Sequence, residues 1–232
     1  MLPYYVSPEQ MMQDKAEYAR KGIAKGKCSL ALEYAGGLLL VAENHSASLQ
    51  KISEVYDRIA FAGAGKYNEF ENLRRAGIKH ADLKGYSYGR QDVTARSLAN
   101  AYSQAIGDVF SQQVKPLEVE LLVVEVGENA GGQNENELYR ISFDGSITDE
   151  HSFAAIGGEA EGVKNHLKDA YREGMDLPAA LAAATGALAR ATGREVGANA
   201  LEVAVLERER EGRRFMRFSR AQLEPLLSGG AK

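Results

Sequence analysis

The chain has 232 residues, 44% hydrophobic and 26% charged, which excludes disordered and collagen-like chains and favours a globular protein. Its 28 basic and 32 acidic residues give a formal net charge of −4, so no general positive charge is available for a phosphate backbone, and we expect no nucleic-acid partner. One cysteine, no signal-peptide pattern at the N-terminus and no apolar run near the roughly 20 residues that span a bilayer predict a cytoplasmic protein without a membrane segment.

The first predicted element is a helix that begins at Pro8. Ser7 is a suitable N-cap, proline fits the first helical turn, and Glu9 lies at the positive end of the helix dipole. An apolar stripe follows at helical spacing, made of Met12, Ala16, Ala19 and Ile23. Residues 1–6 carry no such period, so we interpret them as a tail.

Short apolar runs separated by turn residues then predict four strands, over residues 28–34, 38–42, 48–56 and 58–64. Helical periodicity returns over residues 66–76 and 92–114. The next predicted strands cover 117–126, 138–143 and 153–156, with a polar loop at 127–137 and a turn toward Ile147. Helices are predicted over 159–173 and after the cap Asp176, strands over 201–206 and 215–218, and a last helix over 220–227. Because strands and helices are grouped, the predicted fold is α+β, with antiparallel sheets between layers of helices.

Three segments carry a resemblance to a known family. They are Ser7-Pro8-Glu9 followed by Glu17-Tyr18-Ala19-Arg20, then Lys51-Ile52 leading through Tyr56-Asp57 into 59–65, and then the helix 67–75. Their order and spacing resemble proteasome α-type subunits of the bacterial, actinobacterial kind, over nearly the whole chain. The resemblance implies a four-layer αββα sandwich of the N-terminal-nucleophile hydrolase type with an extra N-terminal helix. It divides the chain into a gate tail (1–7), one domain (8–227) and a C-terminal tail (228–232).

The resemblance also implies a subunit without catalysis and without a cofactor. Family members form heptameric α rings that cap catalytic β rings, admit protein substrates and dock ring-shaped ATPase activators. In β subunits an N-terminal threonine just before the first strand is the nucleophile. Here that position is near Lys27, and the four threonines lie elsewhere, at Thr94, Thr148, Thr185 and Thr192.

Two groups of residues receive roles from the resemblance. Lys51 matches a lysine that lies between neighbouring α subunits and pairs with the C-terminal carboxylate of the activator. Gly26 and Lys66 align with the other two positions of that pocket, although Lys66 replaces an apolar residue. The tail residues Leu2, Pro3, Tyr4, Tyr5 and Val6 are expected to form the gate by apolar crowding, since the archaeal Tyr-Asp-Arg motif is absent.

Two alternatives belong to other classes. Cys28 would be the nucleophile of a self-processing amidohydrolase if residues 1–27 were removed, with Glu43 and Lys51 near it by similarity; a buried apolar role is more usual for a free cysteine. A scaffold protein without a β partner is the third possibility.

Four further patterns receive ordinary structural interpretations. Residues 63–66 resemble a phosphate loop but lack its first glycine and its hydroxyl residue, so a strand-to-helix turn is favoured. The four histidines, at 45, 80, 151 and 166, have no metal-ligand spacing, and no metal site is expected. Residues 208–214 read as a charged hairpin turn around Gly212. Periodicity favours a solvated face for the basic cluster near the N-terminus, with an electrostatic lining at a ring entrance as the alternative; its members are Lys15, Arg20, Lys21, Lys25 and Lys27.

Overall fold

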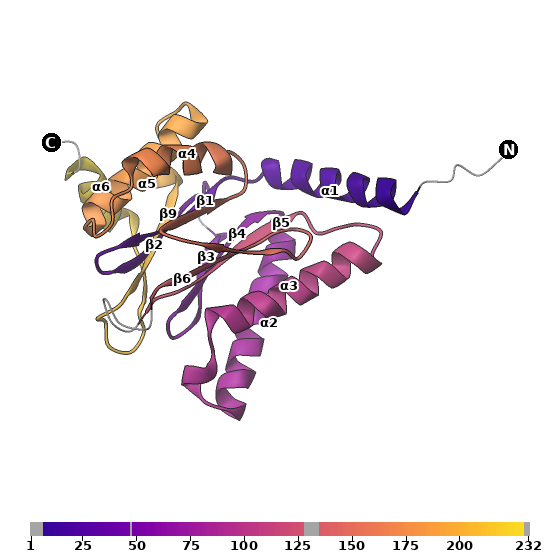
Figure 1. Cartoon of the computed structure of the whole chain (residues 1–232). Helices are drawn as coiled ribbons and strands as arrows, with labels where there is room; N and C mark the ends of the chain where they lie inside the picture. Colours follow the sequence, from indigo (N-terminus) through magenta and orange to yellow (C-terminus); the bar gives the residue numbers. More distant parts are fainter. Residues whose placement is uncertain (1–6, 47, 128–134, 230–232) are drawn as a thin grey trace.

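The computed structural model describes residues 7–46, 48–127 and 135–229 (Figure 1). The predicted gate residues 2–6 therefore lie outside the described part of the chain. The helices are α1 (Pro8–Ala24), α2 (Tyr67–Ser87), α3 (Ala95–Gln112), α4 (Ala160–Ala170), α5 (Leu177–Thr192) and α6 (Arg220–Gly229), with 3-10 turns η1 (Arg90–Asp92) and η2 (Ala198–Ala200). Among these helices of the described residues, none is long and apolar enough to cross a membrane.

Ten strands form two antiparallel sheets of five strands each. They are β1 (Ser29–Tyr34), β2 (Gly37–Glu43), β3 (Ile52–Tyr56), β4 (Ile59–Gly65), β5 (Val119–Glu125), β6 (Glu137–Ile141), β7 (Ile147–Glu150), β8 (Phe153–Ile156), β9 (Leu201–Glu207) and β10 (Phe215–Arg217). The first sheet has the order β10-β9-β2-β1-β8 and the second β3-β4-β5-β6-β7. Helices α4 and α5 cover the first sheet, and α2 and α3 the second (Figure 1). The predicted four-layer αββα sandwich is confirmed.

The period of two along each strand distributes its side chains between two cores. On β2, Leu38 and Leu40 point into the layer between the sheets, whereas Leu39 and Val41 face α4 and α5. On β5, Leu122 lies between the sheets, and its neighbours face α2 and α3. Because both faces are covered, every residue of β2 is buried, which explains its continuous apolar run.

Helix α1 begins where the sequence predicts. The Ser7 hydroxyl accepts a hydrogen bond from the Gln10 amide at 3.1 Å. The helix packs closely from Lys15 onwards, and Ala19 and Ile23 are buried in a small cluster that includes Phe143. The first half extends away from the sheets (Figure 1). The expectation of a solvated basic face is wrong for Lys15. This residue is 8% exposed, and its ammonium donates a hydrogen bond to the Phe110 carbonyl at 3.1 Å.

Several predicted boundaries differ from the structure, and three of the differences have a local cause. The strand expected from residue 48 begins only at Ile52, since the Ser46 hydroxyl binds the amides of residues 48 and 49 and holds a turn there. Helix α2 continues past residue 76 to Ser87, and Gly77 inside it leaves room for the Tyr102 ring of α3. Helix α4 ends at Ala170 rather than 173, because Tyr171 has extended backbone angles.

Candidate functional site

The candidate site surrounds the linker of residues 25–28, which joins α1 to β1. The Gly26 carbonyl accepts a hydrogen bond from the Gly158 amide at 2.8 Å, and the Cys28 carbonyl accepts one from the Glu43 amide at 3.0 Å. On its other side the linker touches β4: a Cβ added at Gly26 would lie 2.6 Å from the Gly65 nitrogen. Glycine at 26 therefore permits a close approach of two backbones, and three separate segments fix the root of α1.

Lys51 reaches this linker from the residue just before β3. Its ammonium donates to the Lys27 carbonyl and, at 3.4 Å, to the Cys28 carbonyl. Burial lowers the pKa of Lys51 to about 8, and the nearest acidic groups oppose that effect only in part. An ammonium held by carbonyl dipoles rather than by a carboxylate retains an attraction for a negative group that comes within reach.

Glu43, at the end of β2, is the acidic partner of the linker. Its side chain is 1% exposed, and one oxygen lies 3.3 Å from Lys27 Nζ and 2.9 Å from His45 Nε2; the same oxygen pairs with Arg194. Burial alone would raise the pKa of this carboxyl, but the hydrogen bonds from Arg194 and His45 outweigh it and the pKa is lowered. Glu43 thus stays ionised and is already satisfied by cations of its own chain.

Lys66 occupies the position between β4 and α2. Its amide donates to the Glu118 carbonyl at 2.9 Å, and its ammonium lies 3.7 Å from a Glu118 carboxylate oxygen and 3.8 Å from one of Glu69. Gly65 before it has φ +98°, a conformation that favours glycine. The ammonium of Lys66 is therefore drawn toward carboxylates, whereas that of Lys51 faces the linker.

Cys28 lies beside this cluster with 2% of its surface exposed, and burial raises the pKa of its thiol to about 12. The thiol is therefore protonated and enclosed while residues 1–27 remain attached. A nucleophilic role would require removal of α1 and a rebuilt surrounding.

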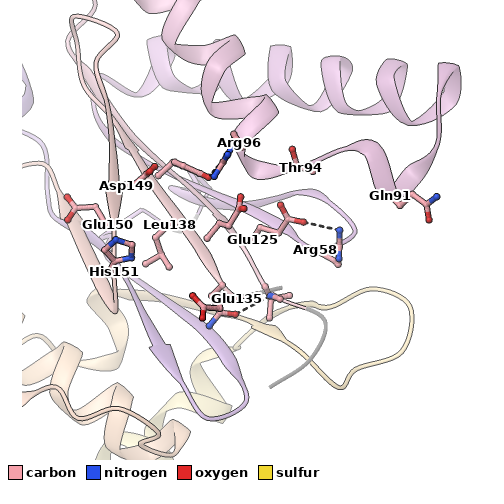
Figure 2. Close-up of a pocket in the computed structure, with 15 residues that line it drawn as sticks. Arg58, Gln91, Thr94, Arg96, Glu125, Glu135, Leu138, Asp149, Glu150 and His151 are labelled. Atoms are coloured by element: carbon pink, nitrogen blue, oxygen red, sulfur yellow. Dashed lines mark hydrogen bonds and ion pairs between the residues drawn. The ribbon is translucent and has the colours of Figure 1, made fainter. Parts of the chain in front are cut away.

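A second candidate is a polar cavity of about 560 Å³ at one end of the strands of the second sheet, where β4 and β6 begin and β5 and β7 end (Figure 2). Arg58 and Glu125 form an ion pair of 3.0 Å there, and the Glu125 carboxylate also accepts from the Ala95 amide at the start of α3. Arg96 donates to the Tyr139 hydroxyl at 3.1 Å. These contacts tie α3 and the β3–β4 turn to the sheet.

The structure brings Gly26 and Lys51 to the same linker, with Lys66 following the Gly65 backbone that Gly26 touches. Sequence reasoning missed His45 and Arg194 as partners of Glu43. Arg194 is 151 residues away in sequence, and no local pattern indicates the pair. It also missed the cavity of Figure 2, whose residues come from five separate segments.

The similarity to known proteins extends over nearly the whole chain. A family model described as "Proteasome subunit" matches residues 23–206. A protein of Thermomonospora curvata is 53% identical over 231 residues, 99% of each chain. One from Xylanimonas cellulosilytica is 54% identical, covering 96% of this chain and 94% of its own, and one from Streptomyces coelicolor is 53% identical, covering 99% and 91%. All three relatives are named "Proteasome subunit alpha".

Proposed function

Because the chain belongs to the proteasome subunit family and is of its actinobacterial alpha type, we propose that it forms the heptameric outer rings of a proteasome core particle. In this role it has no peptidase activity of its own. Two such rings cap the β rings, which carry the peptidase, and the assembly degrades proteins in the cytoplasm.

One observation carries the proposal most directly: α1 precedes β1 and is anchored at its root by the linker. The anchors are the Gly158 amide, the Lys51 ammonium and the close contact with Gly65. A catalytic subunit of this fold needs a free N-terminal nucleophile just before β1. Here that place is occupied by a folded linker, and the neighbouring Cys28 thiol is protonated.

Lys51, Gly26 and Lys66 are proposed to line the pocket that takes the C-terminus of a ring-shaped ATPase activator. Lys51 supplies the charge for a terminal carboxylate, and Gly26 lets the linker lie against the Gly65 backbone, which places the carbonyls that Lys51 binds. Lys66 adds a second ammonium, already shared with Glu118 and Glu69, so we assign it the smaller share of binding.

Leu2, Pro3, Tyr4, Tyr5 and Val6 are proposed to gate substrate entry. They immediately precede the capped start of α1, so seven copies of this apolar tail would meet at the axis of a ring. Crowding of apolar side chains away from water supplies the closing force in this proposal.

The test is co-expression with a β partner, followed by sizing, intact-mass measurement and peptide hydrolysis. We expect a four-ring barrel with peptidase activity that vanishes when the β nucleophile is replaced, and an intact chain that retains residues 1–27. A purified chain that loses those residues and hydrolyses amides by itself would instead identify the Cys28 amidohydrolase. A chain that never associates with the β partner would contradict the proposed assembly.

A further inference from the structure

Helix α1 lies between two hollows on the surface of the chain. The first is a groove of about 550 Å³ between α1 and residues 111–116, which end α3 and lead toward β5. The second hollow, of about 570 Å³, is lined by residues of α1 alone. The two share no lining residue. At 3.6 residues per turn, the α1 residues of the first hollow and those of the second point in directions about 180° apart around the helix axis.

The groove between α1 and residues 111–116 presents apolar side chains to water, and we call it the Val114 groove. Met11, Tyr18 and Val114 are 46%, 48% and 93% exposed. Its walls are held together within the chain, because the Lys115 ammonium lies 5.7 Å from the centre of the Tyr18 ring and 2.8 Å from a carboxylate oxygen of Glu69. The groove is therefore formed in the single chain, and its apolar lining is left open.

The opposite side of α1 carries Met12, and we call it the Met12 flank. By helical spacing Met12 belongs to the same stripe as Ala19 and Ile23, which are buried against the body of the chain. Met12 is nevertheless 40% exposed, because the first half of α1 extends away from the sheets (Figure 1). The apolar stripe thus runs further along the helix than the described part of the chain covers it.

We propose that the Met12 flank of one copy of the chain packs into the Val114 groove of the next copy. The inference rests on the proposed ring and names the side chains of one of its contacts. Because the two surfaces differ and lie on opposite sides of one helix, the contact is heterologous, and every copy offers one surface to each of two neighbours. Such a contact closes into a ring when its rotation repeats a whole number of times in a full turn.

The charges around the two surfaces favour a second copy as the occupant. The charged residues of the Val114 groove are one aspartate and two lysines: Asp14, Lys15 and Lys115. Those of the Met12 flank are two glutamates and one arginine: Glu9, Glu17 and Arg20. The groove therefore has a positive surplus and the flank a negative one. Opposite surplus charge favours the pairing of groove with flank over the pairing of two grooves.

Cysteine cross-linking tests the contact in the barrel assembled with the β partner. The chain carries Met12→Cys and Val114→Cys and is treated with a short bifunctional maleimide, while its own thiol at Cys28 is enclosed at 2% exposure. We expect a ladder of cross-linked copies on a denaturing gel, up to seven, because each contact joins one copy to the next. The control chain carries Met12→Cys and Arg190→Cys. Arg190 is exposed on α5, and this pair should give no ladder.

Substitution of Val114 tests the apolar character of the contact. Since this side chain is 93% exposed, Val114→Glu should leave the circular dichroism of the chain unchanged. We expect the fraction of chain in barrels to fall by about tenfold or more, because the carboxylate would be buried in an apolar contact. Val114→Leu keeps the contact apolar and should assemble like the unchanged chain.

The outcomes separate this inference from the proposed function. If the unchanged chain forms no barrel, the proposed function fails. If the barrel forms but the Met12–Val114 pair gives no ladder, the inference is overturned and the ring stands; full assembly of Val114→Glu overturns it equally. The pair Tyr4→Cys and Val114→Cys examines another occupant. A cross-link of that pair within one chain would assign the groove to the chain's own N-terminal segment and would also overturn the inference.

Discussion

Lys51 carries a positive charge in a surrounding that is partly shielded from water. Its ammonium lies against the carbonyls of residues 27 and 28, and its pKa is lowered to about 8. A carboxylate from an activator would replace or share these carbonyl bonds. Removing one member of a buried charge pair costs around 2–5 kcal/mol, which is a large effect on binding.

We therefore expect Lys51→Ala to weaken stimulation of peptide hydrolysis by the activator ATPase, or by a peptide that copies its C-terminus, by about tenfold or more. Stimulation is measured as a function of activator concentration, with sizing to verify intact barrels. Lys66→Ala is the comparison, and its loss should be smaller because Lys66 is shared with two carboxylates. Full stimulation of the Lys51→Ala barrel would refute the docking role.

The lowered pKa also predicts a dependence on pH. Below pH 8 the Lys51 side chain is mostly protonated and able to bind a carboxylate, and above pH 8 it is mostly neutral. Activator affinity should fall as the pH rises through this window. Lys51→Arg keeps its charge throughout and should flatten the profile. Identical profiles for the two barrels would show that Lys51 does not set the pH response.

The lowered pKa of Lys51 has the opposite effect on the stability of the folded chain. Lys51 titrates near its ordinary value of 10.5 when unfolded, so between pH 8 and that value the unfolded chain binds more protons. This residue then makes the free energy of unfolding rise with pH. Docking and stability thus respond in opposite directions to the same deprotonation.

Gly65 sits at the strand-to-helix turn beside the linker. Its φ is +98°, and a Cβ there would lie 2.0 Å from the Glu118 carbonyl oxygen. Gly65→Ala should lower the free energy of unfolding by more than the roughly 1–3 kcal/mol of backbone strain alone. Gly174→Ala is the control, because Gly174 has φ +74° but open space around its Cα. Equal denaturant midpoints for the two variants would argue against a steric role for the Glu118 carbonyl.

At the scale of elements, α1 has half of its length packed on its own chain. Ala19 and Ile23 are buried, whereas Met11, Met12 and Tyr18 are 46%, 40% and 48% exposed. Such apolar exposure on a well-capped helix favours burial against a neighbouring copy. Deleting residues 1–23 should therefore abolish the ring or barrel, as measured by sizing with the β partner present. Normal assembly of the truncated chain would contradict this role of α1.

Helix α5 offers a stabilising change. Gly186 lies in its interior, and a Cβ added there would meet nothing within 4 Å. Gly186→Ala should raise the free energy of unfolding by about 0.5–1 kcal/mol, because alanine loses less backbone entropy in a helix. At Gly162 in α4 the added Cβ would lie 3.2 Å from that of Ala191, so Gly162→Ala should gain less. Thermal unfolding of both variants measures the difference.

The sequence was informative for elements whose signal is local. Ser7 and Asp176 marked helix starts, and both side chains accept the expected amide bonds. The antiparallel order followed from the grouping of strands. The end of α2 could not be predicted, because Gly77 in its interior makes room for the Tyr102 ring of another helix, and the sequence does not show that contact. The burial of Lys15 was equally hidden, since its acceptor is the Phe110 carbonyl, 95 residues away.

The candidate site divides in the same way. The family resemblance indicated Lys51, Gly26 and Lys66. Gly26 is part of the linker in the fold, and Lys51 binds the linker through the Lys27 carbonyl. The Glu43 partners could not be nominated, because a buried ion pair is formed by tertiary packing and leaves no spacing in the sequence.

At the scale of the whole molecule, the proposed gate predicts a gain of activity on deletion. Removing residues 2–6 should raise hydrolysis of peptides and of unfolded proteins by the barrel, because the apolar tails no longer crowd the entrance. The rate with a small substrate that enters freely serves as the reference for the β active sites. Equal rates for full-length and truncated barrels, with assembly verified by sizing, would show that the tail does not gate.

The contacts along α1 fix where the tail begins. The 17 residues of this helix span about 25 Å at 1.5 Å per residue, from the linker to the cap at Ser7. Lys15, Ala19 and Ile23 hold the helix from its middle to its root. The start of the tail therefore stands at a set distance of about 25 Å from the carbonyls that Lys51 binds, and a ligand at Lys51 is connected to the tail only through a rigid helix.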